Sequence, residues 1–118
     1  MGKAEREKGK RMERWVAGVF NDAGILARRT GWMQSEETDQ EVQDIMPAIP
    51  DVSTGPFAVE CKHRKAHQPW SALAQAEEVA RKGQIPIAVL KRKPREKVLV
   101  VLSLEDFLEM AKVYEEGV

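Results

Sequence analysis

Two acids and a lysine stand close together in the middle of the chain, in a pattern that suits phosphodiester hydrolysis. Asp51 follows a proline, and Glu60 and Lys62 lie two residues apart. This hydrolysis needs an activated water and a positive charge beside the transition state, and Mg²⁺ supplies both. Mg²⁺ usually takes one or two carboxylates in proteins. Asp51 and Glu60 fit that number, and Lys62 would orient the water or neutralise the phosphate.

The segment around Glu60 is expected to form a strand that brings the acid and the lysine to one face. Successive strand side chains alternate, so Glu60 and Lys62 project together while Phe57, Val59 and Cys61 face the core. Asp51, arriving on the preceding strand, would join them. Two carboxylates about 4 Å apart repel by roughly 4 kcal/mol at an effective dielectric of 20, which predicts a cation between them. The alternative is a turn acid beside a solvated strand face.

Apolar spacing elsewhere predicts the elements that position these residues. Helical periodicity predicts helices over residues 4–23, 70–82 and 104–114. Apolar runs and turn residues predict strands at 25–29, 50–53, 56–63, 85–90 and 98–102. The last two runs are apolar throughout, so both strands are expected in the sheet interior, covered on two faces. The predicted fold is α/β, one domain over residues 1–118, with a mixed central sheet flanked by helices in the order α-β-β-β-α-β-β-α.

Composition indicates a small intracellular protein without a disulfide scaffold. The chain has 118 residues and one cysteine, and it lacks an apolar run near the roughly 20 residues that span a bilayer. Nothing in the sequence indicates a signal peptide. We therefore expect a cytoplasmic protein with no membrane partner, in a bacterial, archaeal or phage-infected cell.

Charge is distributed unevenly along the chain, although the formal net charge is zero. Residues 1–14 carry six Lys/Arg against three acids, and residues 62–97 carry ten against three. Residues 34–50 carry five acids and no base. A folded chain could therefore present a cationic face to DNA, because affinity for DNA depends on the local patch. Solvated surface charge is the simpler alternative.

The sequence Pro50-Asp51, an eight-residue spacer and Glu60-Cys61-Lys62 resembles the signature of the PD-(D/E)xK nuclease superfamily. Within it, the chain is most similar to the archaeal-type Holliday junction resolvases and their phage-borne relatives, along nearly its whole length. The resemblance includes a basic first helix that carries a glutamate. It implies a restriction-endonuclease-like fold and a Mg²⁺ cofactor, for which Mn²⁺ would substitute.

The resemblance also implies further site residues. Glu13 on the first helix would be the third acid, although a surface glutamate is the ordinary explanation in such a charged helix. The main-chain carbonyl of Cys61 would ligate the metal, while its thiol faces the core. A helical glutamine, Gln75, would assist. The implied catalytic set is Glu13, Asp51, Glu60, Lys62 and Gln75, and the implied metal ligands are Glu13, Asp51, Glu60 and Cys61.

Basic residues near these positions are expected to contact phosphates. Family members often carry a short serine-bearing segment before the Asp strand. Here that segment is longer and more acidic, and Thr30 or Ser35 could take the serine's place. The predicted DNA-binding residues are Lys8, Lys10, Arg11, Arg14, Arg29, Thr30, Arg64 and Lys65.

The sequence-based hypothesis is a Mg²⁺-dependent endonuclease that resolves four-way (Holliday) DNA junctions by paired symmetric nicks. Two matched nicks require two sites, so a homodimer on branched DNA is expected. Three alternatives stay open. The chain could be a nuclease of the same superfamily that acts on a flap, a fork or a duplex end. It could also be an inactive DNA-binding module, or a structural or regulatory protein without a nucleic acid partner.

Overall fold

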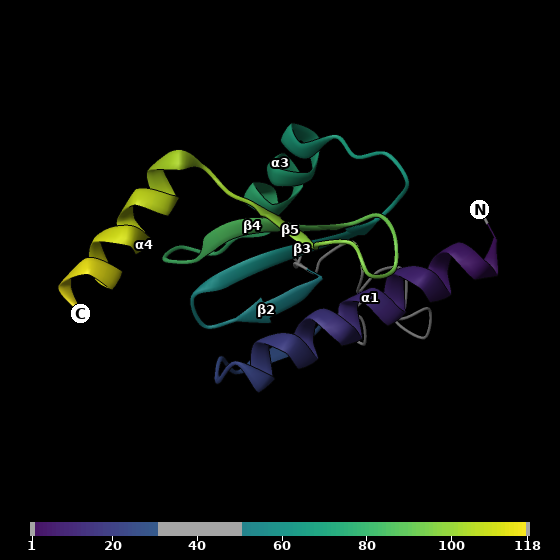
Figure 1. Cartoon of the computed structure of the whole chain (residues 1–118), viewed down its shortest axis with the longest axis horizontal. Coiled ribbons are helices and arrows are strands. Elements are labelled where there is room, and N and C mark those ends of the chain that lie inside the picture. The colour runs from purple at the N-terminus through teal and green to yellow at the C-terminus, as the bar shows by residue number, and fades with distance from the viewer. Residues whose placement is uncertain (1, 31–50, 118) are drawn as a thin grey trace, which may run out of the picture.

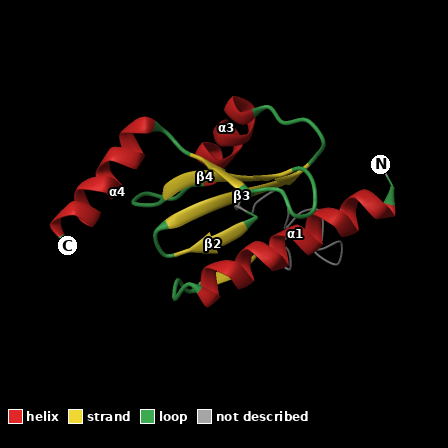
Figure 2. Cartoon of the chain, in the orientation of Figure 1, coloured by secondary structure: helices red, strands yellow, loops and turns green. Residues whose placement is uncertain are grey.

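The computed structural model describes residues 2–30 and 51–117, which form one α/β domain (Figures 1 and 2). The predicted order of elements is confirmed. The predictions for Ser35 and the acidic segment fall outside the described residues. The helices are α1 (Lys3–Asp22), α3 (Pro69–Val79) and α4 (Leu104–Glu116). The strands are β1 (Ala27–Arg29), β2 (Val52–Thr54), β3 (Phe57–His63), β4 (Ile85–Lys91) and β5 (Leu99–Val101). None of these helices is long and apolar enough to cross a membrane.

The five strands form one mixed sheet in the order β1-β2-β3-β4-β5. β3 and β4 are parallel, because α3 returns the chain between them, and the other neighbouring pairs are antiparallel. Val52 pairs with Val59 and Ser53 pairs with Ala58. This register continues to place Asp51 beside Glu60, as the sequence predicted.

Two clusters of apolar side chains pack different helices against the two faces of the sheet. The larger cluster packs Met12 and Val16 of α1 against Val59, Ile87 and Val89. The smaller one packs Ala72 of α3 against Ala88 and Leu90. Figure 1 shows α1 and α3 on opposite faces of the sheet. β4 is therefore an interior strand that is covered on both faces, as its apolar sequence predicts.

The side chain of Asn21 fixes the end of α1 to the sheet. Its amide nitrogen donates to the Ala27 carbonyl at 3.1 Å, and its oxygen accepts from the Ala27 N–H at 2.9 Å. Gly24, with φ of +89°, makes the turn between these residues, a conformation that favours glycine. The helix that carries Glu13 is thereby held at a fixed position along β1.

The C-terminal part of the chain differs from the prediction. The expectation that 98–102 lies in the sheet interior is wrong, because β5 is the last strand of the sheet, and Leu99 and Val100 are 57% and 55% exposed. The N-cap of α4 is as predicted, since Ser103 accepts from the Asp106 N–H at 3.1 Å. However, α4 buries none of its residues and extends away from the sheet (Figure 1).

Candidate active site

Asp51 is held in place by the ends of two strands. Its main-chain carbonyl accepts from the Thr30 N–H at 3.1 Å and from the Thr30 hydroxyl at 3.3 Å. Its carboxylate oxygen Oδ2 accepts from the Cys61 N–H at 2.9 Å. The N–H and C=O of one strand residue point to the same side, so the Cys61 carbonyl is directed toward Asp51 as well. Asp51 therefore joins β1 to β3 through its main chain and its side chain.

Glu60 is buried beside Asp51 and is only 8% exposed. Burial raises the pKa of Glu60 to about 8, and the negative charge of Asp51 and a hydrogen bond between the two carboxyl groups add to the rise. The Lys62 ammonium opposes the shift. Glu60 is therefore largely protonated near neutral pH unless a cation is bound.

Glu13 approaches the same group of acids from α1. Burial raises the pKa of its carboxyl group, and the charge of Asp51 adds to that effect. The Arg29 guanidinium opposes it, because Arg29 Nε lies 3.0 Å from Glu13 Oε1. The third acid that the sequence predicted is thus close enough to Asp51 for their charges to interact.

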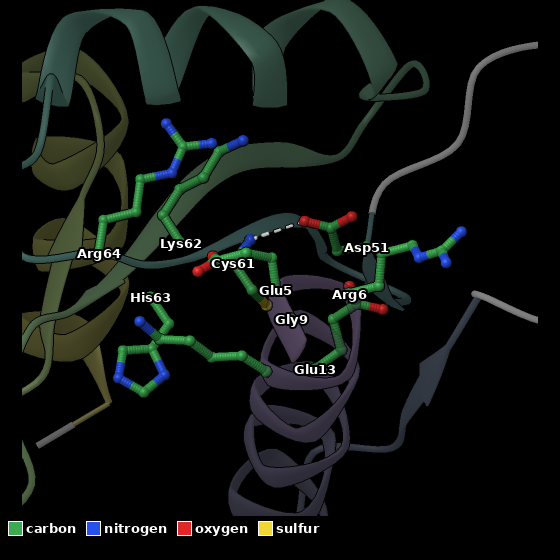
Figure 3. Close-up of a pocket in the computed structure, with 10 residues that line it drawn as sticks. Glu5, Arg6, Gly9, Glu13, Asp51, Cys61, Lys62, His63 and Arg64 are labelled. Atoms are coloured by element: carbon green, nitrogen blue, oxygen red, sulfur yellow. Dashed lines mark hydrogen bonds between the residues drawn. The ribbon is translucent and has the colours of Figure 1, made fainter. Parts of the chain in front are cut away.

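A cleft of about 530 Å³ opens between the first half of α1 and the end of β3 (Figure 3). Lys62 and Arg64 project to one side of β3, whereas His63 projects to the other. Glu60 lies behind this cleft, since it is buried and is not among the lining residues. The lining residues are Glu5, Arg6, Lys8, Gly9, Glu13, Asp51, Cys61, Lys62, His63 and Arg64.

Comparison with family models matches residues 4–116 to the family described as phage putative PDDEXK endonuclease. The chain belongs to this family. Comparisons with curated proteins and with solved structures found no match. Membership in the phage PDDEXK endonuclease family places the chain in the PD-(D/E)xK nuclease superfamily. The matched range contains nearly every residue described above.

The donor atoms of this PDDEXK site suit a hard divalent cation. Asp51 and Glu60 offer neighbouring carboxylate oxygens, and a cation between them would remove the repulsion that raises the pKa of Glu60. Glu13 is paired with Arg29. Within residues 2–30 and 51–117, no group of three or more His, Cys, Asp or Glu side chains stands ready to hold a metal ion. Asp51 and Glu60 would therefore form the core of a Mg²⁺ site, and ligation by Glu13, which is paired with Arg29, stays a prediction.

Cationic side chains gather near the end of β3. Burial lowers the pKa of the His63 imidazole, and the charges of Lys8, Lys91 and Arg11 lower it further. Lys91 Nζ also lies 4.9 Å from the centre of the Trp15 ring. These groups form a positive rim at the cleft.

The predicted DNA-binding residues divide into three groups. Lys8 and Arg64 line the cleft. Arg29 is paired with Glu13, and Thr30 is buried against Asp51, so both have structural contacts at the site. Contact of any of these residues with DNA stays a prediction. The remaining four, Lys10, Arg11, Arg14 and Lys65, are exposed and lie outside the lining of the cleft.

Gln75 is exposed on α3 and is not among the lining residues of the cleft, so its catalytic role stays a prediction. Conversely, sequence reasoning missed Glu5 and Arg6, which line the cleft. Glu5, Gly9 and Glu13 recur at intervals of four, which puts them on one helical face. That spacing was the available signal, since it extends the face of the predicted third acid toward the N-terminus.

Proposed function

We propose that this member of the phage PDDEXK endonuclease family is a Mg²⁺-dependent endonuclease that resolves four-way DNA junctions. The observation that carries the hydrolytic part is the buried Glu60 beside Asp51, which lines a cleft together with Lys62. A buried carboxyl group next to a second carboxyl group is costly, and a site for a cation and a phosphate explains why both are present.

The residues of the chain would divide the work of hydrolysis. Mg²⁺, when bound, supplies positive charge for the phosphate and activates water. Asp51, Glu60 and the Cys61 carbonyl would hold the ion, after Glu60 has lost its proton. Lys62, on the same strand face as Glu60, would orient the attacking water or neutralise the phosphate. The Cys61 thiol takes no part, because burial raises its pKa and it packs against the core.

The branched substrate is supported by the resemblance to junction resolvases and by the positive rim around the cleft. Lys8, Arg64 and Lys91 would hold the phosphates on either side of the cut, since contacts with the backbone position DNA without reading its sequence. One chain offers one cleft, whereas resolution needs two symmetric nicks. We therefore propose that the enzyme acts as a homodimer.

Cleavage of a labelled four-way junction, a flap, a fork and a matched duplex tests this function. The expected result is a pair of symmetric nicks in the junction with Mg²⁺ or Mn²⁺, with the other substrates cut at least about 10-fold more slowly. EDTA should abolish all cleavage. Similar rates on every substrate would contradict junction selectivity but keep the nuclease. Binding without any cleavage would instead indicate a DNA-binding module.

A further inference from the structure

The apolar face of α4 is exposed along its whole length. Leu104, Phe107, Leu108 and Tyr114 are 72%, 53%, 52% and 74% exposed, and Met110 is 39% exposed. Their spacing places them on one side of the helix. The described part of the chain therefore carries a strongly amphipathic helix whose apolar side has no cover.

This surface continues onto the sheet. Leu99 of β5 is more than half exposed and points to the same sheet face as Val101, and β5 has a free edge among the described strands. A groove of about 350 Å³ lies where α3 begins, lined by Trp70, Leu73 and Leu104 among others, and Trp70 is 87% exposed. Helix, edge strand and groove are thus contiguous through Leu104.

The extent of this surface suits an interface between two copies of the chain. Leu99, Trp70 and the apolar residues of α4 together expose roughly 900 Å². This is more than the few hundred Å² that is usual for a patch on a monomer, and it is similar to the roughly 800 Å² that each partner of a stable complex buries. We propose that two copies associate through the apolar face of α4 and the edge strand β5. The interface would be isologous, with each α4 packing against the other subunit.

Most of the negative charge on α4 lies away from the apolar face. Glu105, Glu109 and Glu116 lie on the side opposite the apolar residues and stay in solvent when the apolar faces pack together, whereas Glu115 lies on the apolar side in the last turn. The partner would cover the exposed apolar side chain on this face of β5. An open apolar edge strand favours aggregation, and this cover would remove that risk.

The placement leaves both clefts accessible. Figure 1 shows α4 at the opposite end of the molecule from the N-terminal half of α1, which lines the cleft. Each subunit would therefore present its cleft away from the shared helices. The interface of the homodimer proposed above would therefore lie at α4 and β5. This inference rests on the proposed function in one respect only, because junction resolution is the reason why two clefts are needed.

Measurement of mass by light scattering and sedimentation, without DNA, tests the interface separately from catalysis. The wild type should show twice the chain mass of 13.3 kDa and dissociate on dilution. Phe107→Glu combined with Leu108→Glu should weaken the dimer by at least about 100-fold, because charge would enter an apolar contact. Leu99→Lys, at the exposed β5 position on the same face, should also weaken it.

Val113→Glu is the matched control, because Val113 is 69% exposed yet lies between Glu109 and Glu116 on the charged side. It should leave the dimer within about threefold of wild type. Circular dichroism of each variant establishes that it is folded. A wild type that stays monomeric at about 100 µM, or a folded double variant that dimerises as tightly as wild type, would overturn the proposal. Loss of DNA cleavage alone would bear on the proposed function and not on this surface.

Discussion

The carboxyl group of Asp51, which lies beside Glu60, is positioned by the main chain. Asp51 accepts from the Cys61 N–H through its side chain and from Thr30 through its main-chain carbonyl. Both contacts belong to the ends of strands, which are rigid parts of the fold. This acid is therefore preorganised, and binding of a cation would need little rearrangement at Asp51.

Substitution of Glu60 by glutamine should stabilise the metal-free protein at alkaline pH. The pKa of Glu60 is about 8 in the folded protein, against an ordinary value of 4.5. Between these values the folded state binds more protons than the unfolded state, so the free energy of unfolding falls as pH rises. In EDTA at pH 8, Glu60→Gln should raise that free energy by up to about 4 kcal/mol, and the gain should vanish near pH 4.5. Urea denaturation at several pH values measures it.

Glu78→Gln provides the control, because Glu78 is an exposed glutamate on α3. It should show no comparable gain at pH 8. Added Mg²⁺ should stabilise the wild type and not Glu60→Gln. A Glu60→Gln protein that is less stable than wild type at pH 8 would contradict the account of the acid pair.

The sequence predicted the identity of the central residues but not all of their partners. The signature located Asp51, Glu60 and Lys62, because strand alternation and the turn follow directly from sequence. The pairing of Glu13 with Arg29 joins residues from a helix and a strand. It depends on the angle at which α1 crosses the sheet, which no local pattern contains.

At the scale of elements, the junction between α1 and β1 sets the position of Glu13. Asn21→Ala removes both side-chain hydrogen bonds to Ala27, and it should lower the free energy of unfolding by about 1–2 kcal/mol. Asp22→Ala, at the exposed neighbouring position, should change it by less than about 0.5 kcal/mol. Urea denaturation of the two variants gives this comparison, and equal midpoints would show that Asn21 does not secure the helix.

The strands β4 and β5 show how far apolar pattern predicts structure. Both are apolar runs, and both were expected inside the sheet. β4 meets that expectation with Ile87 and Val89 on one face and Leu90 on the other. β5 does not meet it. An apolar run indicates that a strand needs to be covered, but it does not indicate which element or chain covers it. A second chain supplies the cover in the proposed dimer, and no pattern within one sequence identifies such a partner.

On the scale of the whole molecule, charge and apolar surface are separated. The cations around His63 lie at the cleft, whereas the acidic and apolar faces belong to α4, at the other end of the molecule (Figure 1). A formal net charge of zero therefore hides a surface divided between a site for a polyanion and a site for a partner chain.

The most direct test of the central claim compares initial rates of junction cleavage in Mg²⁺ by the wild type, Asp51→Asn and Lys62→Met. Lys82→Met is the matched control, since Lys82 is exposed and follows α3 outside the cleft. The account predicts that each site variant is folded, binds the junction within about 10-fold of wild type and cleaves it at least about 10³-fold more slowly. It predicts that Lys82→Met cleaves within about twofold of wild type. Site variants that cleave at the wild-type rate would contradict the assignment of Asp51 and Lys62 to the active site.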